Sequence, residues 1–142
     1  MARIQEIVAD ASVACKWFLP EKGAEAALSL RENHIEGRVR ILAPELICYE
    51  VANALRYHPA INTEKLRDSI RSLYDLQLSF THLTSSDLSF AAEFARRHRV
   101  SVYEASYATL AENRSCPLVT DDALLLKVSR RAVRLADWTS HR

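Results

Sequence analysis

Short aliphatic runs alternate with longer segments of helical periodicity along almost the whole chain. The strand-like runs lie at residues 4–9, 39–42, 79–83, 118–120 and 133–135. The helical patterns lie at residues 21–35, about 44–57, 62–76, 84–97, 101–113 and 124–128. Because consecutive parallel strands need a crossover connection, this alternation predicts a mostly parallel sheet covered by helices on both faces. No linker or repeat divides the chain, so we expect a single α/β/α domain spanning residues 1–142.

The composition narrows the classes of function. Nineteen basic and eighteen acidic residues leave a net charge of +1, so any binding of nucleic acid must rest on local patches. Cys15, Cys48 and Cys116 have apolar neighbours and no metal or redox spacing, which predicts buried small hydrophobic residues and a reducing cytoplasm. No apolar run approaches the length of a membrane span, so we expect a cytoplasmic protein with no membrane contact.

One helical segment carries polar side chains where apolar ones are expected. Residues 46–55 are apolar almost all round the helix except for Glu50 and Asn53. We expect both to lie in the interior, where an unpaired carboxylate costs several kcal/mol or binds a proton. A cation near Glu50 is therefore expected. Asn53, three residues on, shares its face of the helix.

Further acids stand where a parallel sheet would bring them to one edge. Asp10 ends the first strand, the pair Asp121–Asp122 ends the fourth, and Glu104 begins a helix. In such sheets, ligands bind outside the carboxyl ends of the strands. Each acid also has a simpler interpretation, because Asp10 and one of the pair suit helix N-caps and Glu104 completes a capping box with Ser101. Capping and metal binding are compatible, since a carboxylate has two oxygens.

Several carboxylates gathered at one edge repel each other unless a cation lies between them. Mg²⁺ and Mn²⁺ prefer hard oxygen ligands of this kind. Such an ion can activate water and neutralise charge on a phosphodiester. The acids therefore point to metal-dependent phosphodiester hydrolysis.

With these residues in view, the chain resembles PIN-domain ribonucleases of the VapC toxin type. The resemblance spans nearly the whole chain and is carried by five segments in the order of the family: Val8–Val13, Lys16–Glu21, Ala43–Asn53, Ser101–Tyr107 and Pro117–Asp122. It implies an α/β/α sandwich and a Mg²⁺- or Mn²⁺-dependent endoribonuclease. Carried over by position, the catalytic and metal-binding quartet is Asp10, Glu50, Glu104 and Asp122, and the supporting residues are Ser12, Asn53, Thr120 and, peripherally, Asp121.

The chain departs from the family at one of these positions. Aspartate usually stands where this chain has Glu104, and the extra methylene moves the carboxylate by more than an ångström. Mg²⁺ tolerates little deviation from octahedral geometry. Glu104 therefore reaches the ion by another rotamer or through water, favours the larger Mn²⁺, or leaves the enzyme slow.

The resemblance also implies partners. These are an RNA substrate, a small antitoxin whose tail covers the acidic cleft, and a second copy of the chain in a homodimer. A partner surface is expected near residues 63–76 with Trp17, Phe18 and Tyr57, although a core position suits the same residues. Candidate RNA contacts are Lys16, Arg96, Arg97, Arg99, Lys127, Arg130 and Arg131, for which solvated helix faces are the simpler interpretation.

Two other functions fit parts of the pattern. A receiver-like signalling domain also gathers acids and Mg²⁺ on a parallel sheet, but it needs a phosphoacceptor aspartate after a middle strand, where this chain has Ala43-Pro44. The second alternative is a PIN fold that serves as an RNA- or protein-binding module, with catalysis weakened or lost through Glu104. Metal binding and RNA cleavage discriminate it from the nuclease.

Overall fold

The computed structural model describes residues 3–138. Its strands are β1 (Gln5–Ala9), β2 (Val39–Pro44), β3 (Ser79–Thr81), β4 (Leu118–Thr120) and β5 (Ala132–Arg134). Its helices are α1 (Ala11–Ala14), α2 (Ala24–Ile35), α3 (Leu46–Leu55), α4 (Thr63–Asp75), α5 (Ser85–His98), α6 (Val102–Arg114) and α7 (Ala123–Val128), with 3₁₀ turns η1 (Cys15–Trp17) and η2 (Leu135–Asp137).

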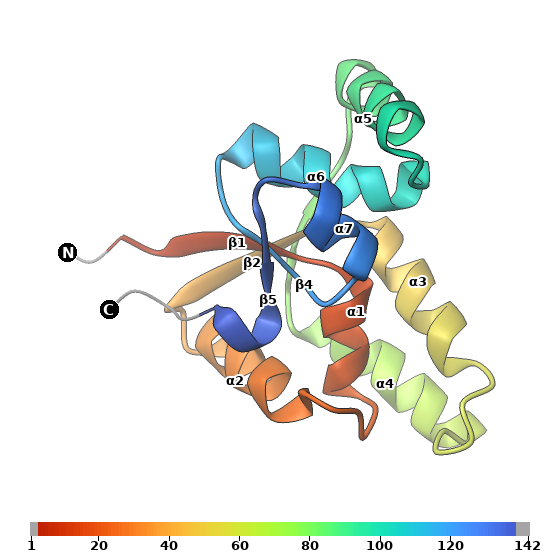
Figure 1. Cartoon of the computed structure of the whole chain (residues 1–142). Helices are drawn as coiled ribbons and strands as arrows, with labels where there is room; N and C mark the ends of the chain where they lie inside the picture. Colours follow the sequence, from red (N-terminus) through yellow and green to blue (C-terminus); the bar gives the residue numbers. More distant parts are fainter. Residues whose placement is uncertain (1–2, 139–142) are drawn as a thin grey trace.

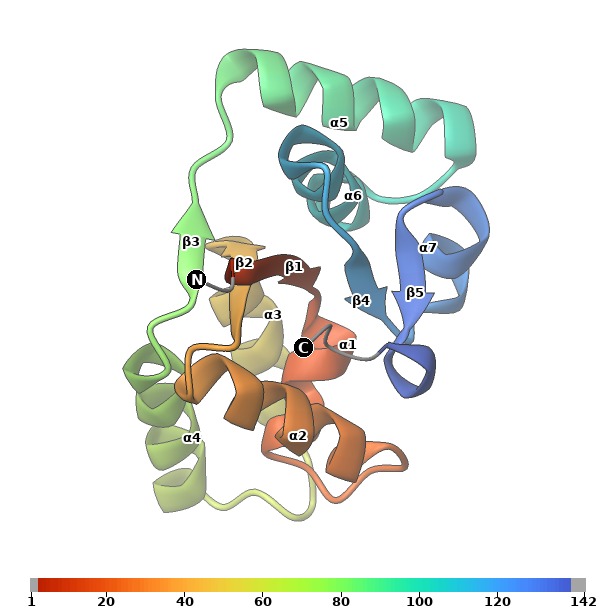
Figure 2. The ribbon, with the colours of Figure 1, turned by 90° about the vertical axis from the view of Figure 1, so that its left-hand side faces the viewer.

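The five strands of the described region form one parallel sheet in the order β3-β2-β1-β4-β5. Helix α6 packs on one face of the sheet and carries α5 on its outer side, while α2 packs against the other face (Figures 1 and 2). This is the three-layer α/β/α sandwich that the alternating sequence pattern predicts, so the predicted fold class is confirmed.

The position of the central strand explains why its segment of the sequence is a continuous apolar run. Strand β1 is paired on both sides, with Val8 opposite Leu42 of β2 and Leu118 of β4. Both faces of a central parallel strand are covered by helices, so alternation of polar and apolar residues is lost. Accordingly Ile7, Val8 and Ala9 are completely buried.

The carboxyl ends of β1, β2 and β4 meet at one edge of the sheet, from which α1, α3 and α7 depart (Figure 1). Asp10 caps α1 by accepting from the backbone N–H of Val13, and Asp122 caps α7 by accepting from that of Leu125. An aspartate is thus the N-cap at each of two adjacent strand ends. This arrangement brings two carboxylates to the same edge.

Two sequence predictions about element bounds are wrong, and one helical region was missed. Pro44 is not in the first turn of a helix but is the last residue of β2, opposite Thr81, where a missing N–H is tolerated. The helix predicted from residue 21 begins at Ala24, because Gly23 caps it in a left-handed conformation with φ of 87°. The two short helical turns over residues 11–17 were not predicted.

The cysteines behave as the sequence predicts. Cys15, Cys48 and Cys116 are buried and unpaired. Burial raises the pKa of Cys15 and of Cys116 to about 11, so both remain neutral thiols at physiological pH. Across residues 3–138, no helix has the length and apolar character needed to span a bilayer.

Truncating the core of β2 is expected to destabilise the fold. Ile41 is completely buried at the centre of the sheet, so Ile41→Ala should lower the free energy of unfolding by about 2–5 kcal/mol. Ile35→Ala is a matched control, because Ile35 is 56% exposed at the end of α2, and it should change stability by less than about 0.5 kcal/mol. Urea denaturation measures both; equal losses would contradict this description of the core.

Candidate active site

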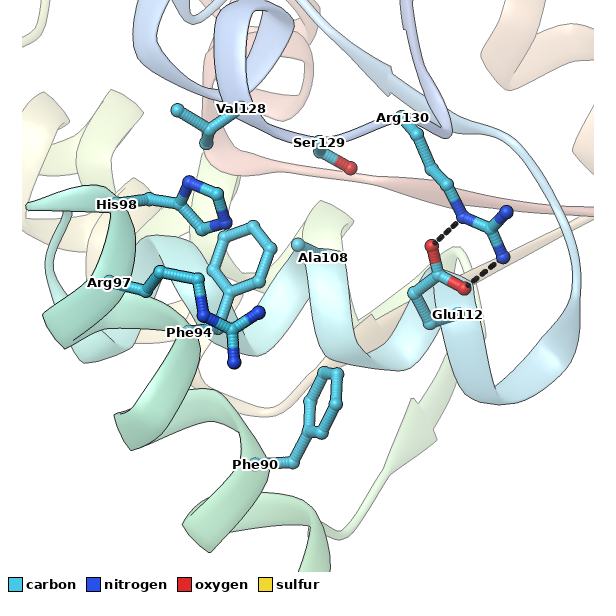
Figure 3. Close-up of a pocket in the computed structure, with 9 residues that line it drawn as sticks. All are labelled: Phe90, Phe94, Arg97, His98, Ala108, Glu112, Val128, Ser129 and Arg130. Carbon is cyan, nitrogen blue, oxygen red and sulfur yellow. Dashed lines mark hydrogen bonds and ion pairs between the residues drawn. The ribbon is translucent and has the colours of Figure 1, made fainter.

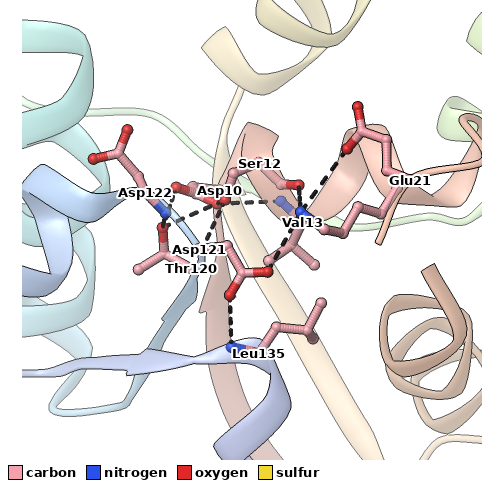
Figure 4. A network of polar contacts seen from close by, with 9 residues as sticks. Asp10, Ser12, Val13, Glu21, Thr120, Asp121, Asp122 and Leu135 are labelled. Atoms are coloured by element: carbon pink, nitrogen blue, oxygen red, sulfur yellow. Dashed lines mark hydrogen bonds and ion pairs between the residues drawn. The ribbon is translucent and has the colours of Figure 1, made fainter. Parts of the chain in front are cut away.

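Asp10 is held at the end of β1 by two hydroxyl groups. Ser12 Oγ donates to Asp10 Oδ1 at 2.6 Å, and Thr120 Oγ1 donates to Asp10 Oδ2 at 2.5 Å (Figure 4). The backbone N–H of Val13 also donates to Oδ1 at 3.3 Å. Both carboxylate oxygens are therefore fixed, and Asp10 remains 3% exposed.

The same two hydroxyls fix the backbone that carries the acid pair after β4. The N–H of Asp121 donates to Ser12 Oγ at 3.0 Å, and the N–H of Asp122 donates to Thr120 Oγ1 at 2.9 Å. Each hydroxyl thus donates to Asp10 and accepts from the neighbouring loop. These bonds lock the ends of β1 and β4 together and place both hydroxyls in contact with Asp10.

The buried position of Asp10 disfavours the charged form of its side chain. Burial raises its pKa to about 6, opposed by the hydrogen bonds from Ser12 and Thr120 and reinforced by the negative charge of Asp122. Burial is the main cause of the raised pKa, and the charge of Asp122 adds a smaller contribution. A cation nearby would favour the ionised form of Asp10.

Glu50 meets a partner that the sequence did not reveal. The Tyr107 hydroxyl on α6 donates to Glu50 Oε1 on α3 at 2.5 Å. Burial raises the pKa of Glu50, the bond from Tyr107 lowers it, and the charges of Glu104 and Asp122 raise it again. Burial and the bond to Glu50 also raise the pKa of Tyr107, so it stays a neutral donor. A buried tyrosine hydroxyl needs a partner, but sequence alone does not connect residues 107 and 50.

Glu104 and Asp122 each use one oxygen locally. Glu104 Oε1 accepts from the N–H of Ser101 at 2.9 Å, which completes the predicted capping box at the start of α6. Asp122 Oδ1 accepts from the N–H of Leu125 at 2.9 Å at the start of α7. Because Glu104 and Asp122 both raise the pKa of Glu50, all four predicted acids lie within electrostatic reach of at least one other.

The interior position predicted for the polar residues of α3 is only half right. Glu50 is partly buried, whereas Asn53 is exposed, because α3 lies at the rim of the sheet with one side facing solvent. Glu50 and Asn53 do share a face: both line a depression of about 380 Å³ together with Ser12, Cys15 and Lys16. Asn53 is therefore at the mouth of the site and not in the core.

Lys16 and Asp121 pair with each other beside the acids. Lys16 Nζ lies 3.3 Å from Asp121 Oδ2 and 3.9 Å from Glu21 Oε2, and its side chain is only 10% exposed. Asp121 Oδ1 also accepts from the N–H of Leu135 at 3.2 Å, which ties η2 to this edge (Figure 4). Asp121 thus belongs to a structural ion pair at the periphery of the acids.

The other predicted basic residues lie on two separate elements. Arg96, Arg97 and Arg99 are exposed at the end of α5, and Lys127 is exposed in the last turn of α7. Arg130 and Arg131 follow α7 and both pair with Glu112 of α6. Among the predicted partner-surface residues, Trp17 is buried and donates to the carbonyl of Ala27 at 2.8 Å, whereas Tyr57 is 84% exposed.

Comparison with known proteins agrees with this geometry. The model of the PIN domain matches residues 7–131. The chain belongs to the PIN-domain family. The resemblance noted in the sequence is confirmed.

Individual PIN-domain relatives support the same grouping. The chain is 28% identical over 124 residues to Ribonuclease VapC3 of Pyrobaculum aerophilum, an alignment covering 84% of this chain and 92% of that protein. The crystal structure of PAE2754 from the same organism has a TM-score of 0.66 and 28% identity, covering 93% and 92% of the two chains. FitAcB of Neisseria gonorrhoeae has a TM-score of 0.61 at 15% identity, covering 93% and 99%, a likeness of fold alone.

Neutralising Asp10 is expected to stabilise the PIN domain at neutral pH when no divalent ion is present. The native pKa near 6 exceeds the ordinary value of 3.8, so the native state binds more protons than the unfolded state between those values. Wild-type stability should therefore fall as pH rises through this window and then level off. Asp10→Asn, which buries no charge, should be more stable by about 1–3 kcal/mol at pH 7.5 and by about zero at pH 4.

Urea denaturation in EDTA at both pH values measures this difference. Asp137→Asn is the control, because Asp137 is exposed and pairs only with Arg134 among the described residues, so it should shift stability little at either pH. An Asp10→Asn protein that is less stable than wild type at pH 7.5 would show that the native state favours the charge.

Proposed function

We propose that this protein is a metal-dependent endoribonuclease and the toxin of a VapBC-type toxin–antitoxin pair. The observation that carries the proposal is the gathering of four acids at the carboxyl edge of the sheet. There the charge of Asp122 helps to raise the pKa of Asp10, and the charges of Glu104 and Asp122 help to raise the pKa of Glu50. Membership of the PIN family and similarity to a protein named Ribonuclease VapC3 support ribonuclease chemistry at that edge.

The donor set fits Mg²⁺ or Mn²⁺ in its chemistry, because all four side chains offer carboxylate oxygens. Glu50, Glu104 and Asp122 each use one oxygen in the bonds described above, so their second oxygens remain for an ion. In the part of the chain from residue 3 to 138, no three acidic, histidine or cysteine side chains already converge closely enough to hold a metal. Binding therefore requires these side chains to move closer together, and Glu50 and Glu104 are only half-buried.

A bound divalent ion would supply activation of water and neutralisation of charge on the scissile phosphodiester. The chain's own residues prepare that chemistry. Ser12 and Thr120 partly offset the cost of burying the charge of Asp10, and Tyr107 orients Glu50 by fixing Oε1. Asn53 at the mouth of the depression is placed to contact the RNA or a water molecule.

The proposal extends to partners and location. Arg96, Arg97, Arg99, Lys127, Arg130 and Arg131 are proposed RNA contacts, whereas Lys16, engaged with Asp121, is proposed to act by positioning the loop. A small antitoxin protein and a homodimer are proposed from the VapC-type resemblance. Tyr57 and Tyr74, 84% and 57% exposed, supply apolar area for such contacts. Three neutral thiols are consistent with the proposed reducing cytoplasm.

Purified protein is expected to cut structured RNA in Mg²⁺ or Mn²⁺ and to stop cutting in EDTA. Glu50→Ala should reduce the rate by at least about 100-fold, because it removes both a ligand and the partner of Tyr107. Gel analysis of end-labelled RNA measures the rate, and the products should carry 5′-phosphates since water is the nucleophile. Ile35→Ala, on the exposed end of α2, serves as a control with wild-type cleavage.

Glu104→Asp discriminates between the nuclease and the binding module. A rate increase in Glu104→Asp, with wild type active, would show that Glu104 works as a ligand of suboptimal length. Cleavage by neither protein, with either ion, would contradict the nuclease and favour the module. Cleavage that survives Glu50→Ala would remove the proposed site.

A further inference from the structure

A second pocket lies outside the acidic edge, between α5, α6 and the turn that joins α7 to β5. Its volume is about 340 Å³. It is lined by Phe90, Phe94, Arg97, His98, Ala108, Glu112, Val128, Ser129 and Arg130. Figure 3 shows Arg97 on one side of this pocket and Arg130 on the other, with Ala108 of α6 between them. The site described above uses none of these groups for chemistry.

The pocket brings together two basic clusters that are distant in sequence. Arg97 comes from the end of α5, and Arg130 follows α7, more than thirty positions later. Their convergence is a product of the fold, since α5 packs along α6 and α7 lies beside it. A pocket bordered by guanidinium groups on two sides suits an anionic ligand.

The pocket also presents aromatic surface. Phe90 is 46% exposed on the wall formed by α5. One turn along the same helix, the Phe94 ring packs against the His98 ring at 4.4 Å between centroids. Exposed aromatic faces next to arginine are the arrangement on which bases of single-stranded nucleic acid stack, because every base has a π-face.

The charges in the pocket differ in how firmly they are held. Arg130 makes a bidentate pair with Glu112, with N–O distances of 2.8 and 3.0 Å, and Arg131 Nε lies 3.3 Å from the same carboxylate. Within residues 3–138, Arg97 has no ion pair and no hydrogen bond from its side chain. The guanidinium group of Arg97 is thus available to a ligand. The guanidinium group of Arg130 is held in place by Glu112.

The pocket continues from the acidic edge along two helices. Ala108 stands four residues after Glu104 on α6, a rise of about 6 Å. Val128 ends the short helix that Asp122 caps. The near wall of the pocket therefore begins about one helical turn from Glu104.

We propose that this pocket binds one nucleotide of single-stranded RNA next to the cleavage site, with its base stacked on Phe90 and its phosphate contacted by Arg97. The proposal rests on the ribonuclease function proposed above and adds a binding subsite to it. Net positive charge beside an exposed aromatic ring favours a nucleotide as the ligand, because its phosphate pairs with Arg97 and its base stacks on the ring. An apolar peptide would leave Arg97 unpaired.

Fluorescence anisotropy with a labelled single-stranded RNA in EDTA tests the subsite without cleavage. Phe90→Ala should weaken RNA binding about fivefold or more, and Phe90→Trp should restore it, because stacking needs only a π-face. Arg97→Ala should weaken binding and lower the salt slope of the affinity by about 0.7–1. Leu88→Ala and Arg67→Ala, exposed on α5 and α4, remove an apolar group and a charge elsewhere and should bind as wild type.

The outcomes separate this proposal from the function on which it rests. Wild type that binds and cuts RNA, with Phe90→Ala and Arg97→Ala binding equally well, would overturn the subsite and leave the nuclease standing. Wild type that neither binds nor cuts RNA would overturn both. The Arg97→Ala variant could instead keep its RNA affinity and lose binding of a polyglutamate peptide. That result would assign the pocket to a protein partner and overturn the proposal.

Discussion

The hydrogen bonds to the buried carboxylate of Asp10 are the interactions on which the acidic edge depends. Ser12 and Thr120 donate to its two oxygens and accept from the backbone that leads to Asp121 and Asp122. The charge therefore organises the ends of β1 and β4, although burial raises its pKa to about 6. Hydrogen bonds of this kind compensate only part of the cost of burying a charge, and the remainder is what a cation would relieve.

The remaining acids reach this edge for reasons of local structure. Parallel strands end together, the helices that follow need N-caps, and capping carboxylates are favoured by the helix dipole. Asp122 and Glu104 therefore cap α7 and α6 with one oxygen and leave the other free. Glu50 alone has no capping role, and its bond from Tyr107 crosses from α3 to α6. Most of these acids therefore stabilise the start of a helix, and Glu50 is the exception.

Much of this could be predicted from sequence because the signals are local. Apolar runs define the strands, and the capping box at Ser101 occurs where its spacing predicts. The bond between Tyr107 and Glu50 could not be predicted, since it joins residues that only tertiary packing brings together. Asn53 was misplaced for a related reason: an apolar helix at the rim of a sheet still exposes one side to solvent. Periodicity reports which face is apolar, but not how far a neighbouring helix covers it.

Binding of Mn²⁺ to the RNA-free protein, followed by calorimetry and thermal unfolding, tests the central claim most directly. The acids should bind the ion saturably and raise the melting temperature, with about 2.7 kcal/mol of stabilisation at a hundredfold excess over the dissociation constant. Asp122→Asn should lose most of this effect, whereas Asp137→Asn, whose exposed carboxylate pairs with Arg134, should retain it. Equal stability with and without Mn²⁺, and no heat of binding, would contradict the claim that these acids form a metal site.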